Sequence, residues 1–195
     1  MNNAALLLTV VVPVFNTAEG FLRRCFSSLP FGDEERFEVI VVDDGSNEET
    51  KECLFACAAS YGTRFNLFRQ ENMGQSAARR RGARLAQGEY VMFLDSDDYL
   101  DTRSFTSLLD ILEMDSPDLL GFNYATVDET GRTIQSFMRF DRTYADWDKR
   151  DLICTSSSLW SQVYRKSLVL EHLASAPDDL RIGEDLSVAV PVAVA

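Results

Sequence analysis

Four short apolar runs, separated by stretches of helical length, constrain the fold of this 195-residue chain more than any other feature. The runs cover Leu6–Val14, Phe37–Val42, Phe65–Phe68 and Tyr90–Leu94. Nearly continuous runs of Val, Ile, Leu and Phe, without alternating polar residues, are typical of strands that are covered on both faces. They predict the buried strands of a parallel sheet.

Amphipathic segments fill the intervals between these runs, at Ala18–Leu29, Glu48–Tyr61 and Gln75–Gln87. The first predicts a helix whose apolar face carries Phe21, Leu22, Cys25, Phe26 and Leu29. The third ends before Gly88, which we expect to be its C-cap. Because strands that alternate with helices form βαβ units, this half predicts an α/β, Rossmann-like, mostly parallel sheet flanked by helices.

The second half of the chain follows a different pattern. Arg103–Met114 predicts a helix, and two short strands at Leu119–Val127 and Thr133–Phe140 flank an Asp-Glu-Thr-Gly turn. A turn of this kind between apolar runs predicts a small antiparallel hairpin. Leu159–His172 has no single periodicity. We expect residues 1–195 to form one domain, and the ten apolar residues at the end lead us to expect a chain cut from a longer protein rather than a last packed element.

The charge balance narrows the classes of partner. Asp and Glu number 31 against 19 Lys and Arg, which gives a net charge of −12. A generic nucleic-acid binder is therefore not expected, because such proteins bind mainly by neutralising phosphates. The longest apolar run, Ala4–Phe15, is shorter than the ~20 residues of a membrane span and lacks the features of a signal peptide. We expect a cytoplasmic protein.

The four cysteines favour packing over metal chemistry. They are Cys25, Cys53, Cys57 and Cys154. A zinc site would need further Cys or His ligands beside the Cys53–Cys57 pair, and the single histidine, His172, is distant in the sequence. We interpret the cysteines as small apolar core residues in a reducing compartment.

Acidic residues follow the predicted strands where a ligand is expected. The strand-end motifs are Pro13-Val14-Phe15-Asn16, Asp43-Asp44-Gly45-Ser46 and Asp95-Ser96-Asp97-Asp98. Parallel strands bring their carboxyl ends to one edge of the sheet, which is where such folds bind ligands. Carboxylates about 4 Å apart repel each other by about 4 kcal/mol at an effective dielectric of about 20, and a hard cation such as Mg²⁺ or Mn²⁺ relieves that repulsion. The alternative is that each Asp only starts a turn or caps a helix.

Two further segments carry candidate functional groups. Gly74 precedes a predicted helix start, and Arg79, Arg80, Arg81 and Arg84 on that helix form the one dense basic patch of the chain. One of these arginines is a candidate for a phosphate, while the others are expected on a solvated face. With its single histidine outside any motif, the chain favours a carboxylate as general base, and Glu184-Asp185 supplies one.

These motifs, taken in order, resemble those of the family 2 glycosyltransferases, which have the GT-A fold. They run from Val11–Asn16 and Val41–Ser46 through Asn72–Arg79 and Gly88–Asp98 to Leu159–Lys166 and Gly183–Asp185. Each motif is weak alone, but their common order over nearly the whole chain is specific.

The resemblance implies a nucleotide pocket at the first two strand ends. Pro13, Phe15 and Asn16 would line the site of the base and ribose. Asp44, with Asp43, would accept a hydrogen bond from the uracil ring N–H, which implies a UDP-sugar donor.

The resemblance also implies a diphosphate and metal site at the fourth strand end. Asp95 and Asp97 would form the Asp-x-Asp motif, with Asp97 binding Mn²⁺ or Mg²⁺ at the diphosphate and Asp95 reaching the ribose or the metal. Asp98 is a further candidate metal ligand, and Arg79 would lie near the nucleotide.

The implied reaction is an inverting sugar transfer. Asp185, with Glu184 beside it, would be the general base that takes the proton of the acceptor hydroxyl. The acceptor would be a glycan or a lipid-linked molecule, as in polysaccharide or cell-wall biosynthesis, and the basic helix would allow peripheral membrane contact. Residues 1–100 would be the nucleotide-binding half and residues 101–195 the acceptor-side half.

Two other functions remain open. A nucleotidyltransferase also combines an α/β fold with metal-binding acids, but the segment after the first strand, Pro13–Gly20, has one glycine and no Lys or Arg for phosphates. A non-catalytic module that binds nucleotide-sugars is the other, and the presence of Asp185 counts against it.

Overall fold

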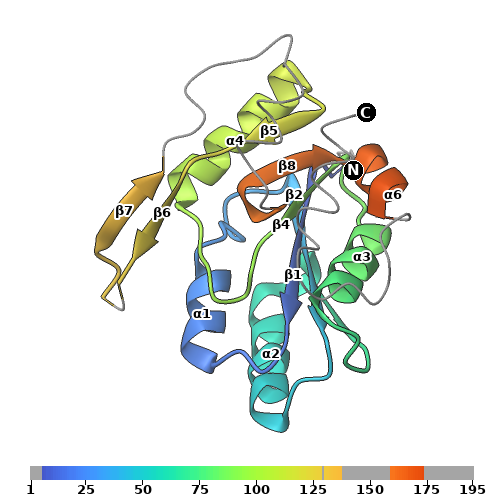
Figure 1. The fold of residues 1–195 in the computed structure, drawn as a ribbon, viewed down its shortest axis with the longest axis vertical. Helices are drawn as coiled ribbons and strands as arrows, with labels where there is room; N and C mark the ends of the chain where they lie inside the picture. Colours follow the sequence, from blue (N-terminus) through green and yellow to red (C-terminus); the bar gives the residue numbers. More distant parts are fainter. Residues whose placement is uncertain (1–5, 129, 138–158, 174–195) are drawn as a thin grey trace.

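A mostly parallel sheet forms the centre of the molecule, as predicted. The computed structural model describes residues 6–128, 130–137 and 159–173, and within them six strands form the main sheet (Figure 1). In spatial order these are β3 (Phe65–Arg69), β2 (Phe37–Asp43), β1 (Leu8–Val14), β4 (Tyr90–Phe93), β8 (Gln162–Arg165) and β5 (Leu119–Gly121). The first four are mutually parallel, and β8 runs antiparallel to both of its neighbours.

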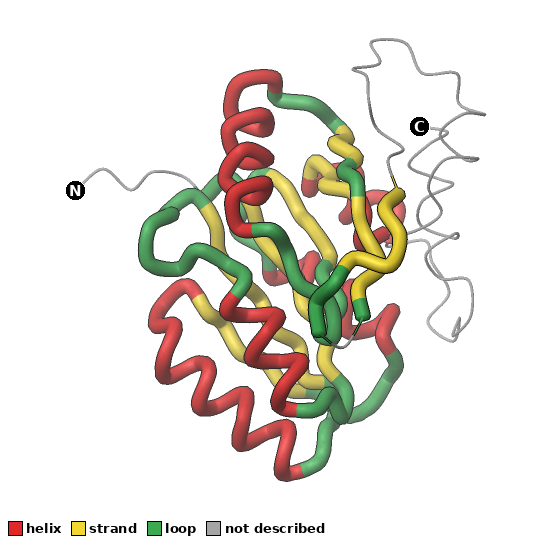
Figure 2. Tube along the Cα trace, turned by 90° about the vertical axis from the view of Figure 1, so that its left-hand side faces the viewer, coloured by secondary structure: helices red, strands yellow, loops and turns green. Residues whose placement is uncertain are grey.

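Helices cover both faces of the sheet. One face carries α1 (Glu19–Ser27), α2 (Glu48–Tyr61) and α4 (Thr102–Asp115), which lie in front of the strands in Figure 2. The other face carries α3 (Gln75–Leu85) and α6 (Lys166–Leu173). Short 3₁₀ turns, η1 (Gly62–Arg64) and η2 (Leu159–Ser161), lead into β3 and β8. The predicted helices of the first half therefore form, with bounds shifted by at most two residues at either end.

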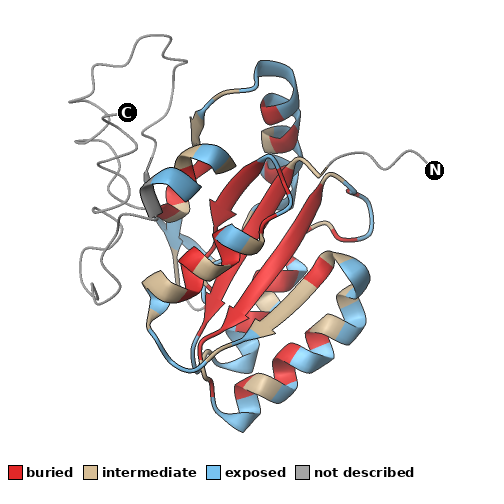
Figure 3. Ribbon diagram, turned by 90° about the vertical axis from the view of Figure 1, so that its right-hand side faces the viewer, coloured by how far each residue is buried: buried red, intermediate tan, exposed pale blue. Residues whose placement is uncertain are grey.

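The apolar runs are continuous because each strand packs on two sides. All seven residues of β1 and all seven of β2 are buried, as the strands in Figure 3 show. Val10 and Val12 of β1 pack with α1 and α4, whereas Val11 packs with Ala83 of α3 and Val169 of α6. Successive side chains of a strand point to opposite faces, so burial on both faces favours apolar residues along the whole strand. The buried polar residues Thr9 and Glu38 are satisfied by each other, since the Thr9 hydroxyl donates to Glu38 Oε1 at 2.8 Å.

The strand order reverses beside β1, and this reversal fixes where a ligand can bind. The chain passes from β1 to β2 to β3 in one direction and then crosses back, so that β4 lies on the other side of β1. In open α/β sheets, the carboxyl ends of strands at such a reversal border a crevice.

The second half departs from the sequence prediction in two places. The expected strand Leu119–Val127 is two strands, because β5 joins the main sheet while β6 (Tyr124–Val127) pairs with β7 (Thr133–Phe137). The break follows Gly121, where the Phe122 N–H donates to the carbonyl of Ser161 at 3.0 Å. The predicted antiparallel hairpin is confirmed as β6–β7. Strand β8 was missed, since its four residues include a buried glutamine.

Gly88 is not the C-cap of α3. The helix ends at Leu85, and the following residue, Ala86, has an extended backbone. Gly88 instead lies against β1, where a Cβ atom would be 2.7 Å from the carbonyl carbon of Leu8 and the nitrogen of Thr9. The Gly88 N–H donates to the Thr9 hydroxyl at 2.9 Å. The glycine therefore serves a close approach between backbones and not a left-handed turn.

The described cysteines lie in the core, as expected. Cys25, Cys53 and Cys57 are buried free thiols, and burial raises the pKa of Cys57 to about 11. Cys154 lies outside the described residues. Within the described ranges, no helix combines the length and apolarity needed to cross a membrane.

Candidate functional site

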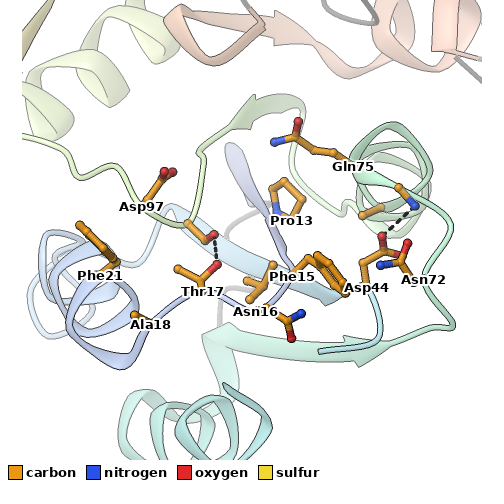
Figure 4. Close-up of a pocket in the computed structure, with 14 residues that line it drawn as sticks. Pro13, Phe15, Asn16, Thr17, Ala18, Phe21, Asp44, Asn72, Gln75 and Asp97 are labelled. Carbon is orange, nitrogen blue, oxygen red and sulfur yellow. Dashed lines mark hydrogen bonds between the residues drawn. The ribbon is translucent and has the colours of Figure 1, made fainter. Parts of the chain in front are cut away.

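An open cleft with a volume of about 690 Å³ lies at the carboxyl ends of β1, β2 and β4. Its walls come from residues 13–18, from Phe21 of α1, from Asp44, from the start of α3 and from Ser96 and Asp97 (Figure 4). Three strand-end motifs predicted from the sequence therefore meet at one cleft. Pro13, Phe15, Asn16, Asp44 and Asp97 line it directly.

The loop after β1 is held in place by the start of α2. Asn16 has a positive φ of 52°, a conformation that asparagine tolerates better than most residues. Its side-chain oxygen accepts from the Asn47 N–H at 2.8 Å, and its own N–H donates to the Ser46 hydroxyl at 3.0 Å. With Asn16 fixed in this way, Phe15 is 51% exposed and contributes its ring to the cleft wall.

Asp44 organises the cleft wall that faces Phe15. Its Oδ1 accepts from Gln70 Nε2 at 2.7 Å and from the Met73 N–H at 2.9 Å, while Oδ2 accepts from the Gly74 N–H at 2.8 Å. The residue is 3% exposed. Three donors from residues 70–74 thus converge on one carboxylate, which shapes the loop that leads into α3.

Asp43 lies behind the cleft. Its Oδ1 accepts from the Ser46 N–H at 2.8 Å, and its Oδ2 pairs with Arg69 Nη1 at 2.7 Å. Gly45, in the turn between Asp43 and Ser46, has a φ of 80°, and a Cβ there would be 2.9 Å from the Asn72 nitrogen. Asp43 therefore holds the turn that presents Asp44. The sequence predicts both carboxylates at the base, whereas in the structure only Asp44 lines the cleft.

The turn after β4 presents Asp97 to the cleft and turns Asp95 towards α3. Asp95 Oδ1 accepts from Arg79 Nη2 at 2.8 Å and from Gln75 Nε2 at 3.0 Å. The Thr17 and Ser96 hydroxyls are 2.7 Å apart and link this turn to the loop after β1. Asp97 is exposed and lines the cleft.

The acidic turn fits a cation that is shared with a phosphate. Among the described residues, no three His, Cys, Asp or Glu side chains are arranged to hold a metal ion by themselves. Mg²⁺ in proteins is commonly bound by one or two carboxylates together with substrate phosphates, and Asp97 and Asp98 suit that role. Partial burial of the Asp98 carboxyl group, with the nearby charges of Asp95 and Asp97, raises its pKa to about 6. A cation would relieve this repulsion.

The arginines of α3 are placed differently from the expected solvated patch. Arg79 is 2% exposed and pairs with Asp95, and Arg80 is 4% exposed. Arg81 Nη1 donates to the Arg69 carbonyl at 2.8 Å, and Arg84 is the one exposed member of the four. Arg79 contacts the site through its ion pair with Asp95. Most of the basic patch that was predicted to allow membrane contact is therefore engaged in contacts within the protein.

Two predicted catalytic residues, Glu184 and Asp185, lie outside the described residues. The structure adds residues that sequence reasoning missed, namely Phe21, Thr17 and Gln75. Phe21 was predicted to face the core, because it fits the helical spacing of Leu22, Cys25 and Phe26, yet it is 50% exposed in the cleft. No signal in the sequence separates it from the residues that are buried.

Comparison with known proteins agrees with this architecture. EpsH of Bacillus subtilis (strain 168), which carries the name of a glycosyltransferase, is 32% identical over 177 residues, covering 87% of this chain and 50% of EpsH. Residues 1–349 of S. aureus TarS superpose with a TM-score of 0.78 at 23% identity, over 96% of this chain and 55% of that one. TarS has also been crystallised with UDP and with UDP-GlcNAc.

A more distant structure has the same fold. The mannosyltransferase PcManGT from Pyrobaculum calidifontis, in complex with GDP-Man and Mn²⁺, has a TM-score of 0.63 at 18% identity, over 91% of this chain and 49% of that one. The chain thus spans about half the length of these relatives.

The family model described as Glycosyl transferase family 2 matches residues 9–172, from β1 to α6. The match takes in every motif that lines the cleft, and it favours a glycosyltransferase over the alternative of a nucleotidyltransferase. The chain belongs to glycosyl transferase family 2.

Proposed function

We propose that the cleft binds a nucleotide-sugar, specifically a UDP-sugar, and that the protein transfers the sugar to a hydroxyl of a glycan or lipid-linked acceptor with inversion. The observation that carries the proposal is the cleft itself. It has an aromatic ring and a buried carboxylate, Phe15 and Asp44, towards one end and an exposed carboxylate, Asp97, towards the other (Figure 4). That order of groups suits a base, a ribose and a diphosphate laid along one cleft.

Asp44 supports the choice of uracil. A carboxylate has about four acceptor positions, and three of those on Asp44 are taken by the loop at residues 70–74. The remaining position, on Oδ2, suits the ring N–H of uracil. Cytosine presents an acceptor at the same ring position, so Asp44 would repel it. The half-exposed ring of Phe15 would stack on the base.

Asp97, with Asp95 or Asp98, would hold a divalent cation, Mn²⁺ or Mg²⁺, at the diphosphate. Such a cation supplies positive charge that stabilises the departing nucleoside diphosphate. Arg79 and Gln75 both donate to Asp95, and they would fix the orientation of its carboxylate before the donor arrives. The complexes of TarS with UDP and UDP-GlcNAc, and of PcManGT with GDP-Man and Mn²⁺, support a nucleotide-sugar donor and a metal.

Residues of the second half would complete the reaction. In this proposal residues 1–100 bind the donor and residues 101–195 face the acceptor. Asp185, with Glu184 beside it, takes the proton of the acceptor hydroxyl while that oxygen attacks the anomeric carbon from the side opposite the diphosphate. A single displacement inverts the configuration and needs no covalent intermediate with the enzyme.

A titration of the chain with UDP, CDP and GDP in Mn²⁺ tests the donor assignment. We expect UDP to bind more tightly than CDP, because Asp44 accepts from one base and repels the other. Equal affinity for UDP and CDP would contradict the assignment. Release of free sugar from UDP-sugars, measured with and without candidate acceptors, then separates a transferase from a module that only binds the donor.

A further inference from the structure

Phe21 is an aromatic residue that the core does not use. It lies in the first turn of α1, and its side chain is 50% exposed, whereas Leu22, Cys25 and Phe26 on the same helix are fully buried. Its ring lines the cleft. When a ligand covers a half-exposed apolar ring in a cleft, apolar surface of the ring is removed from water, and this favours binding.

The position of α1 places this ring at the Asp97 end of the cleft. Arg24 stacks over the Tyr99 ring with its guanidinium carbon 3.9 Å from the ring centre, and the Cys25 thiol donates to the Asp95 carbonyl at 3.8 Å. These two residues follow Phe21 by one helical turn, and helical side chains lean towards the N-terminus. The contacts therefore seat α1 on the turn that carries Asp97.

The close-up of the cleft agrees with these contacts. Figure 4 shows Phe21 and Asp97 towards one end and Asp44 towards the other, with Thr17 between them. The hydrogen bond between Thr17 and Ser96 closes the floor at the Asp97 end. A ligand that extends from Asp44 past Asp97 meets the Phe21 ring next.

We propose that Phe21 is the platform on which the hexose of the nucleotide-sugar donor stacks. This inference rests on the proposed function, in which the base lies at Asp44 and the diphosphate at Asp97. The sugar is then the group that follows the diphosphate. One face of a pyranose ring is a patch of C–H groups, which packs on an aromatic face, while its hydroxyls donate to a neighbouring carboxylate such as Asp97.

Affinities for UDP and for UDP-hexoses test the platform. The variants are Phe21→Ala, Phe21→Leu and Phe21→Trp, with Phe55→Ala as the matched control, because Phe55 is a 56%-exposed phenylalanine on α2 that does not line this cleft. Each is titrated calorimetrically in Mn²⁺ with UDP, UDP-glucose, UDP-galactose and UDP-GlcNAc. The exposure of Phe21 makes loss of the fold unexpected, and circular dichroism of each variant verifies it.

We expect Phe21→Ala to weaken binding of the preferred UDP-hexose by about threefold to tenfold while binding of UDP is retained, because only the sugar loses its aromatic partner. Phe21→Leu should show most of this loss, and Phe21→Trp and Phe55→Ala should bind like the unmodified chain. A UDP-hexose affinity that is the same in Phe21→Ala overturns the platform and leaves the proposed function standing. If the unmodified chain binds none of the four ligands, the proposed function fails and the platform fails with it.

Discussion

The hydrogen bonds of Asp44 make one substitution informative about both the fold and the cleft. Asp44→Asn keeps the size of the side chain and replaces one acceptor oxygen with an NH₂ donor. If the amide oxygen takes the place of Oδ1, the bonds from Gln70 and Met73 survive, and the NH₂ group faces the N–H of Gly74. The opposite orientation loses two bonds and keeps one.

The better orientation sets the expected cost. One hydrogen bond to a charged acceptor is worth about 1.5–3 kcal/mol, and leaving the partly buried Gly74 N–H without an acceptor adds about 1 kcal/mol more. The substitution should therefore lower the free energy of unfolding by about 2.5–4 kcal/mol. With an m-value of about 2–3 kcal/mol/M in urea, the midpoint of unfolding falls by about 1–2 M.

Urea unfolding followed by circular dichroism measures this loss, and Asp128→Asn is the matched control. Asp128 Oδ1 also accepts three bonds, two from Thr130 and one from Arg132, in the exposed turn of the hairpin. An amide oxygen can keep all of them, so the control should unfold close to the unmodified chain. UDP binding should be lost in Asp44→Asn and retained in Asp128→Asn.

Equal urea midpoints for Asp44→Asn and the unmodified chain would refute the reasoning. That result would mean that the Gly74 N–H finds another acceptor without cost. Lower stability with unchanged UDP affinity would refute only the role of Asp44 at the base.

Two other substitutions test separate parts of the structure. Gly88→Ala should lower the free energy of unfolding by about 1–3 kcal/mol, because the new Cβ meets the backbone of Leu8. Gly20→Ala is the control, because a Cβ there has nothing within 4 Å, and it should not destabilise the protein. Equal stability of the two variants would contradict the close approach at Gly88. Asp98→Asn should raise the melting temperature in EDTA at pH 7. The pKa of Asp98 is raised to about 6, so the metal-free protein loses stability as pH rises from about 4 to 6. Solvent screening limits the gain to about 1 kcal/mol, and it should vanish below about pH 4; no gain at pH 7 would contradict it.

The long parallel strands could be predicted because burial on both faces determines their residue types. β1, β2 and β4 are covered by helices on both faces, so their sequences are nearly unbroken apolar runs. β8 has only four residues, and one of them is a buried glutamine. Gln162 is 3% exposed, and its side-chain oxygen accepts from the Tyr164 hydroxyl at 2.7 Å. A short strand whose polar group is satisfied inside the fold gives no periodic signal, since its place depends on neighbours from distant parts of the chain.

The site could be located from the sequence, but its internal arrangement could not. Strand ends gave Asp44 and Asp97, because parallel strands finish at one edge. Which carboxylate points into the cleft depends on the turn: Asp43 is turned to Arg69, and Asp95 is turned to Arg79, which lies 16 residues earlier. Such pairings form across space, so residue type and spacing do not reveal them.

Calorimetric titration of the chain with UDP, first in Mn²⁺ and then in EDTA, tests the central claim that this cleft binds a nucleoside diphosphate with a cation at Asp97. The account predicts binding in Mn²⁺ that is lost in EDTA and lost in Asp97→Ala. Asp101→Ala is the control, because Asp101 only caps α4, where it accepts from the Ser104 N–H at 2.8 Å. UDP binding that is unchanged by EDTA and by Asp97→Ala would contradict the account.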